Sequence, residues 1–167
     1  LMSKLEVYHC GNDDPNVYFA LLSDFCDSED EYNDIDKKIV DCGLRCAAQL
    51  NKKYGNKFFF LSRKRTYNEK MGVYMGRERK RGKLLEFMSL IRGYSDNTFD
   101  VISSPIDDIR DAKYIITLDE DTFMPRETVY KLVGAMSHVL NVPYVNKKNV
   151  VIRGYNIMQP KVSISME

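Results

Sequence analysis

The chain has 167 residues, of which 44% are apolar and 29% are charged, and its formal net charge is +1. This composition is that of a globular protein long enough to bury a core. The total charge argues neither for nor against nucleic acid, and no stretch approaches the ~18–20 continuous apolar residues of a membrane-spanning helix. Because the first residues also lack the apolar core of a signal peptide, we expect a cytosolic protein or a cytosolic part of a larger one.

A strand and a long helix come first. Residues 17–25 form an apolar run that ends in an acid, which predicts a strand covered on both faces. Over residues 35–54, apolar side chains recur at three- and four-residue steps, which predicts an amphipathic helix. Asp34 or Asp36 would cap this helix, and Gly55 would end it. Its inward stripe, with two cysteines as buried thiols, would be Ile35, Ile39, Cys42, Cys46 and Leu50.

A second strand, a second helix and a third strand follow. Residues 57–63 predict a strand, and residues 78–91 predict a helix that stops at Gly93. The inward side chains of this helix would be Leu84, Leu85, Phe87, Met88 and Ile91. Residues 113–118 predict a further strand that ends at Asp119.

The last third of the chain predicts a helix and then extended structure. Pro125 would open a helix that ends near Leu140, and residues 149–166 would form a pair of strands. The inward residues of the helix would be Val129, Leu132, Val133 and Met136, and the alternating residues of the strands Val150, Ile152, Tyr155, Ile157, Val162 and Ile164. The order of elements predicts one α/β domain over residues 1–167, with a mostly parallel sheet and helices on both faces.

In a sheet of this kind, ligands bind outside the carboxyl ends of the strands. In this chain those ends carry Asp24, then Arg63 and Lys64, and then Asp119 and Asp121. Acids and bases that converge at one rim predict a site for a metal ion and an anionic ligand.

Asp119 and Asp121 are the candidate metal ligands. Two aspartates at i and i+2 can both reach one hard divalent cation, Mg²⁺ or Mn²⁺, which keeps positions open for phosphate oxygens. A cation held there would stabilise a diphosphate as a leaving group. The plain alternative is a polar turn, because an Asp-x-Asp pair alone occurs often by chance.

A basic run over residues 77–83 is the second candidate. It lies at a predicted helix start, where the helix dipole disfavours cations, so an anionic ligand held by Lys80 and Lys83 explains it better. A solvated basic face is the plain alternative. A nucleic-acid patch beside Tyr67 and Tyr74 is another, but the near-neutral total charge counts against it, and we expect no nucleic acid.

Several runs are similar to the glycosyltransferase region of cyclic β-1,2-glucan synthases. They are residues 19–25, 72–84, 114–122, 125–126, 132–136 and 154–161, and they cover nearly the whole chain in the same order. The basic run with its glycines and the Gly-Tyr…Gln-Pro run are the most specific of them. The family favours tryptophans around the basic run, whereas this chain has none and carries Tyr74 and Arg77 in those neighbourhoods; it also has Lys161 where arginine is more usual.

The resemblance implies a glucosyltransferase that moves glucose from UDP-glucose to a growing β-1,2-glucan. It also implies a GT-A-like nucleotide-diphospho-sugar transferase domain within a multidomain enzyme at the cytosolic face of the bacterial inner membrane. By the same resemblance, Asp24 would lie near the nucleotide and Lys80 and Lys83 near the diphosphate. Asp119 and Asp121 would hold the metal.

The resemblance also implies an incomplete domain. The first strand of the sheet and the general base of the transfer reaction would lie outside this chain, in the remainder of the enzyme. We therefore expect either a dimer or disorder near residues 1–16, and little transfer by this piece alone. The alternatives are a nucleotide-sugar or polyanion binding module without turnover and, on residues 77–83 alone, a scaffold for nucleic acid.

Overall fold

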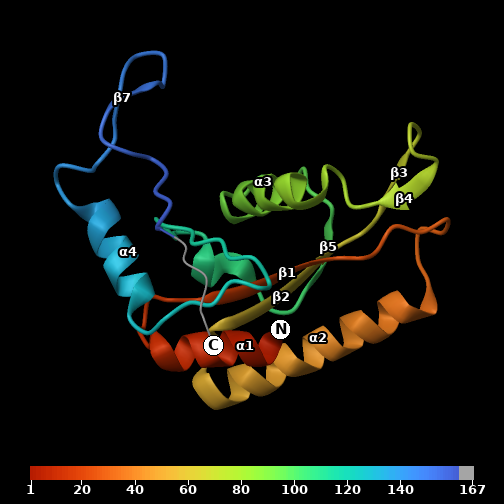
Figure 1. Ribbon diagram of the computed structural model, residues 1–167. Coiled ribbons are helices and arrows are strands. Elements are labelled where there is room, and N and C mark those ends of the chain that lie inside the picture. Colours follow the sequence, from red (N-terminus) through yellow and green to blue (C-terminus); the bar gives the residue numbers. More distant parts are fainter. Residues whose placement is uncertain (162–167) are drawn as a thin grey trace. The chain divides into compact units, whose positions relative to one another are not determined.

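The structure is a computed structural model in which residues 1–161 are described (Figure 1). The chain divides into two compact units, Leu1–Ile115 and Ile116–Glu167. The first unit contains α1 (Met2–Gly11), β1 (Phe19–Asp24), α2 (Asp34–Tyr54), β2 (Phe58–Arg63), β3 (Thr66–Asn68), β4 (Val73–Met75), α3 (Arg79–Ile91), β5 (Phe99–Ile102) and a 3-10 turn, η1 (Ile106–Ile109). The second contains α4 (Thr128–Ser137), β6 (Tyr144–Val145) and β7 (Val151–Arg153).

The first unit is built on a three-stranded mixed sheet of order β1-β2-β5. β1 and β2 are parallel, whereas β5 is antiparallel to β2. The prediction of a mostly parallel sheet is therefore wrong. The reason lies at the carboxyl end of β2, where the Lys64 amide donates to the Thr98 carbonyl at 2.9 Å. The chain therefore enters β5 where β2 ends and has to run back along it. The α/β class itself is confirmed.

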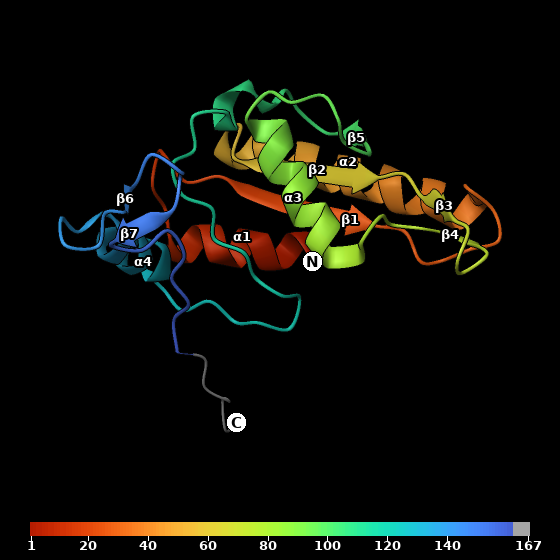
Figure 2. The same ribbon diagram turned by 90° about the horizontal axis from the view of Figure 1, so that it is seen from above.

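Helices cover both faces of this sheet, as predicted, because the side chains of β2 alternate between them. Phe58 and Phe60 meet α1 and α2, while Phe59 and Leu61 join the side chains of α3 in one apolar cluster. Figure 2 shows α3 crossing over β1 and β2, with the β3–β4 hairpin extending beyond the ends of these strands. All six residues of β2 are buried, which makes this strand the centre of the unit.

Helix α2 starts and ends almost where predicted but turns a different face inward. The buried residues are Asp36, Gly43, Ala47 and Leu50, while Ile35 and Cys42 are exposed. Gly43 has to face the sheet because a side chain there would start 2.5 Å from the ring of Phe60. The predicted stripe is therefore wrong except at Leu50, and so is the buried pair of thiols, because close packing at a glycine sets the rotation of the helix.

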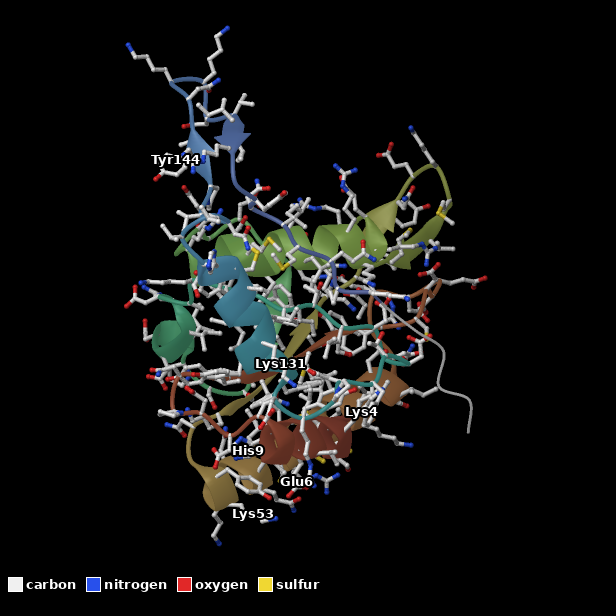
Figure 3. All side chains as sticks on the ribbon, turned by 60° about the vertical axis from the view of Figure 1, so that its left-hand side comes forward. Lys4, Glu6, His9, Lys53, Lys131 and Tyr144 are labelled. Atoms are coloured by element: carbon white, nitrogen blue, oxygen red, sulfur yellow. The ribbon has the colours of Figure 1, made fainter. Side chains whose placement is uncertain are left out.

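Residues 2–11 form helix α1 and not the disordered segment expected near the start of the chain. The His9 ring is buried against the rings of Phe19, Tyr54 and Phe58. Glu6 adds an ion pair to Lys53 of α2, with 2.8 Å between Oε1 and Nζ; Figure 3 labels both residues. Helix α1 therefore has a defined place on α2 and β1. A dimer remains a prediction.

The predicted strand over residues 113–118 is absent from the described part of the chain. A strand needs a hydrogen-bonded neighbour, and β5 already occupies the second edge of β2. The segment has no regular secondary structure, and its apolar side chains Ile115 and Leu118 are more than a third exposed. Asp119 therefore follows an unpaired segment and not a strand end.

The second unit has little core of its own. Helix α4 begins at Thr128, after Pro125, and its four predicted inward residues are half-buried. The strand pair is β6 with β7 and lies earlier than predicted, because the Asn146–Asn149 turn reverses the chain before Val150. Tyr155 and Ile157 lie outside strands, and the predicted positions 162 and 164 lie outside the described residues. No helix in residues 1–161 has the length and hydropathy needed to cross a bilayer.

Candidate functional site

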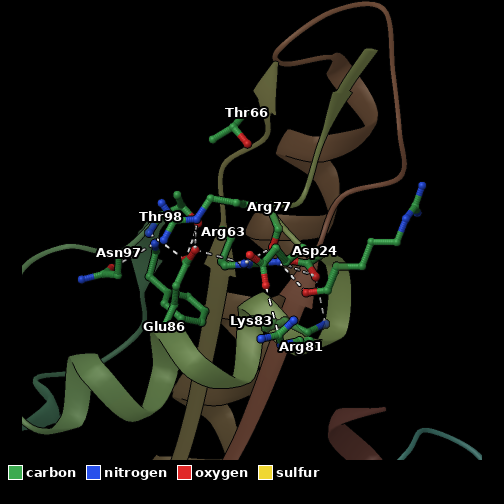
Figure 4. A network of polar contacts seen from close by, with 12 residues as sticks. Asp24, Arg63, Thr66, Arg77, Arg81, Lys83, Glu86, Asn97 and Thr98 are labelled. Carbon is green, nitrogen blue, oxygen red and sulfur yellow. Dashed lines mark hydrogen bonds and ion pairs between the residues drawn. The ribbon is translucent and has the colours of Figure 1, made fainter. Parts of the chain in front are cut away.

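The guanidinium of Arg63 lies at the centre of a polar network at the carboxyl ends of β1 and β2 (Figure 4). Its side chain is 0% exposed. Nε and one Nη donate to the two carboxylate oxygens of Asp24 at 2.7 and 3.1 Å, which is the bidentate geometry that suits arginine. The same group donates to the carbonyls of Arg77 and Arg79 at 3.1 and 3.0 Å. One buried cation thus ties the end of β1 to the segment that leads into α3.

That segment is strained where Arg63 holds it. Glu78 and Arg79 both have left-handed backbone conformations, with φ of 50° and 49°. Such conformations cost energy in residues with a side chain, and they persist only where surrounding contacts enforce them. The two carbonyls bound by Arg63 flank Glu78, so the buried guanidinium supplies this enforcement.

Two glycines let the strained segment approach so closely. A side chain at Gly76 would start 2.9 Å from a terminal nitrogen of Arg63 and 3.1 Å from the carboxyl carbon of Asp24. A side chain at Gly82 would start 2.1 Å from the Arg77 carbonyl oxygen. The glycines of the basic run are thus explained by packing.

Glu86 of α3 is a second buried acid in the network, with 4% of its side chain exposed. One oxygen accepts hydrogen bonds from the Thr98 amide at 2.9 Å and the Thr98 hydroxyl at 2.6 Å. The other lies 3.4 Å from Arg63 and 3.1 Å from Arg77 without an aligned hydrogen bond. Burial raises the pKa of Glu86, but the Thr98 hydrogen bonds and the two guanidinium charges outweigh it, so the pKa lies below its usual value.

Five side chains form a continuous chain of ion pairs with alternating sign, in the order Arg77, Glu86, Arg63, Asp24, Lys83. We call it the charge chain. Lys83 Nζ lies 3.2 Å from Asp24, so the structure brings together these two predicted site residues. Arg63 and Glu86 are buried, with 0% and 4% of their side chains exposed, whereas Asp24, Lys83 and Arg77 are 19%, 20% and 51% exposed. With three cations and two carboxylates, the charge chain carries a net charge of +1.

The other predicted residues of the basic run are more exposed. Lys80 lies on the exposed side of the first turn of α3. Arg79 pairs with Asp27 at 2.7 Å, and Arg81 lies 3.8 Å from Glu78. In the second helix of the prediction, Leu85 is exposed and Glu86 takes the inward place, which is a further correction.

Asp119 and Asp121 belong to the second unit and lie on a turn that closes with a 3.1 Å hydrogen bond from the Thr122 amide to the Asp119 carbonyl. Both side chains are exposed. Residues 1–161 contain no group of three or more acids, histidines or cysteines arranged to hold a metal. Two carboxylates supply the oxygen donors that Mg²⁺ or Mn²⁺ prefers, and they fit a cation that takes its other ligands from phosphate and water.

Sequence reasoning named Asp24, Lys80 and Lys83 but missed the residues that hold Asp24, and through it Lys83, in place. Arg63 was noted only as a strand-end base, and Glu86 was not noted at all because it lies within an apolar stripe. One signal was present: an acid between Leu85 and Phe87, on the inward side of a helix, requires a buried cation as partner.

No family model matches the chain. The chain is 40% identical over 99% of its length to the cyclic beta-(1,2)-glucan synthase NdvB of Rhizobium meliloti (strain 1021). It spans only 6% of the length of that protein. The resemblance predicted from the motifs is thus confirmed as a relationship to one segment of such a synthase.

Proposed function

We propose that this chain contributes the donor site of a glycosyltransferase that moves glucose from UDP-glucose to a growing β-1,2-glucan. The observation that carries this proposal is the 40% identity over 99% of the chain to a segment of a cyclic β-1,2-glucan synthase. A GT-A-like fold, the remainder of a larger enzyme and a place at the cytosolic membrane face belong to the same proposal.

In this proposal the residues of the first unit hold the donor. Lys83 and Lys80 bind the diphosphate, and Asp24 fixes Lys83 through the 3.2 Å ion pair between them. Arg63 prevents Asp24 from moving, because both oxygens of that carboxylate accept its hydrogen bonds. Asp24 therefore acts on the nucleotide side mainly by placing a cation.

In the second unit, Asp119 and Asp121 would bind Mg²⁺ or Mn²⁺ together with the diphosphate. The cation, when bound, supplies positive charge that stabilises the departing nucleoside diphosphate. The two carboxylates provide oxygen ligands and are exposed, so a ligand can reach them. In this proposal, the base that activates the acceptor hydroxyl belongs to the remainder of the enzyme.

Calorimetric titration with UDP-glucose, with and without manganese, tests the proposal. We expect manganese-dependent binding by the wild-type chain and its loss in the double variant Asp119→Ala/Asp121→Ala. Glu127→Gln is the matched control, because Glu127 is another exposed acid of the second unit and pairs with the exposed Lys131. Unchanged manganese-dependent affinity in the double variant would exclude these two residues as the metal site.

Charge reversal at Lys80 and Lys83 tests the other half of the site. It should weaken binding of UDP-glucose and leave binding of glucose unchanged, because the lysines act on phosphates. Loss of RNA binding instead would favour the nucleic-acid alternative. Donor binding without glucose transfer, even by a longer polypeptide that includes this segment, would favour a binding module without turnover.

A further inference from the structure

Arg77 is held in an unusual way for a half-exposed arginine. Its Nε lies 3.1 Å from a carboxylate oxygen of Glu86, and only 4% of the Glu86 side chain is exposed. The other Glu86 oxygen is fixed by two hydrogen bonds from Thr98, so the acid cannot turn away. The stem of Arg77 is therefore anchored at Nε, while half of the side chain stays open to solvent.

An arginine anchored at Nε keeps its two terminal amino groups for another partner. These groups form a planar fork that matches two oxygens of a phosphate or carboxylate. In the described part of the chain the only ion pair of the Arg77 side chain is the one with Glu86. The Glu86 oxygen that faces Arg77 receives no aligned hydrogen bond, so the acid holds Arg77 by charge and does not saturate the guanidinium.

The charge chain connects this fork to Lys83. Its three interior members, Arg63 between Glu86 and Asp24, carry a net charge of −1, and its two partly exposed ends are both cations. An anion of two charged groups that contacted both ends would offset the net charge of +1 without disturbing the buried members. A single exposed salt bridge would not need a buried acid, Glu86, and a buried arginine, Arg63, behind it.

We propose that Arg77 is a further anion-binding residue, which acts with Lys83 as a two-cation clamp for a diphosphate. Glu86 is its positioning residue. This inference rests on the proposed function for the identity of the natural ligand, the diphosphate of a nucleotide sugar. It adds a residue that the predicted site did not contain.

Calorimetric titration of the 167-residue chain with inorganic pyrophosphate, and in parallel with UDP, tests the clamp. Arg77→Gln should lower the affinity for pyrophosphate by about tenfold or more, the usual effect of losing a charge-assisted hydrogen bond. The matched control is Arg81→Gln, which removes the same charge from an 81% exposed side chain in the same run. It should change the affinity by less than about twofold.

A second pair of variants keeps the net charge and protects the test from loss of folding. Arg77→Lys should also weaken pyrophosphate binding, because lysine cannot be anchored at Nε and present a fork at once. Arg81→Lys should leave it unchanged. Circular dichroism of all four variants checks that each is folded.

The outcomes separate this inference from the proposed function. Equal affinities of the Arg77 and Arg81 variants would overturn the clamp, even if thermal stability fell, because Arg77 would then only neutralise Glu86. Pyrophosphate binding that depends on Arg77, with no binding of UDP, would support the clamp and contradict the proposed function. A wild-type chain that binds neither anion would overturn both.

Discussion

The charge chain and the Asp119–Asp121 turn are both polar candidate sites, but they are built in opposite ways. In the charge chain of the first unit, each buried charged group has a partner within 3.4 Å. The backbone at Glu78 and Arg79 beside it is strained, and Gly76 and Gly82 allow close packing there. In the second unit, two exposed carboxylates lie on a short turn whose neighbouring helix has no fully buried residue. The charge chain is therefore part of the packed structure of its unit, whereas the two aspartates are exposed side chains that the packing does not involve.

Because of this difference, substitutions in the charge chain should mainly change stability, and substitutions in the Asp119–Asp121 turn should mainly change ligand binding. Charges that are buried and paired cannot be removed singly without stranding a partner, so substitution there disturbs folding. Exposed acids on a turn contribute little to folding, so substitution there reports on ligands alone. Substitutions at four places in the chain would sharpen or break this comparison.

Arg63→Met should have the largest effect on the free energy of unfolding. It leaves the carboxylates of Asp24 and Glu86 without the cation between them and frees the strained turn at Glu78. We expect a loss of about 3–5 kcal/mol, measured by urea denaturation. Arg81→Met, which removes an exposed arginine, is the control. A loss below about 1 kcal/mol for Arg63→Met would mean that the charge chain does not hold the fold together.

Gly82→Ala should be the next most harmful change. The new methyl group would lie 2.1 Å from the Arg77 carbonyl oxygen, which also accepts a hydrogen bond from Arg63. We expect a destabilisation of about 1–3 kcal/mol from overpacking. Gly134→Ala in α4 is the matched substitution in the second unit, where the new methyl group would meet no described atom within 4 Å beyond the neighbouring backbone of its own helix. It should be neutral or stabilise by up to about 1 kcal/mol, and a similar loss at both glycines would contradict the comparison.

Glu86→Gln should have a smaller effect that depends on pH. The folded protein lowers the pKa of Glu86, so the carboxylate stabilises the fold above its ordinary pKa. This contribution is lost as the pH falls through the lowered value. Thermal unfolding between pH 7 and pH 3 should therefore show a steeper loss for the wild type than for Glu86→Gln. Parallel curves for the two proteins would show that Glu86 does not contribute to acid sensitivity.

The smallest effect on stability is expected at the exposed acids. Asp119→Ala and Asp121→Ala should each change the free energy of unfolding by less than about 0.5 kcal/mol, because neither side chain is buried. Their circular dichroism should match that of the wild type even where manganese-dependent UDP binding is lost. A cooperative loss of structure in either variant would instead show that the turn is a structural element.

Much of the first unit could be predicted from sequence, because local signals and the final packing agree there. The run at 17–25, the periodic helix over 35–54 and the apolar run at 57–63 became β1, α2 and β2 with only small shifts at their ends. Predicted site residues Asp24 and Lys83 proved to be in contact. Hydropathy is informative in these segments because each is continuous and long enough to bury a face.

The errors share one physical cause, which is that partners far apart in sequence decide the outcome. Residues 113–118 have the composition of a strand, yet β5 took the free edge of β2 in the opposite direction. The face that α2 buries was set by the fit of Gly43 against Phe60, and apolar periodicity could not reveal that contact.

By itself, the sequence determined the α/β class, the main elements of the first unit and the relationship to a glucan synthase segment, because these depend on local pattern and on residue identity. The tertiary structure alone decided the mixed sheet, the burial of Glu86 and the order of the charge chain. An ion pair forms only between side chains that lie close together in space. Arg63, Asp24 and Glu86 come that close only when β1, β2 and α3 pack together.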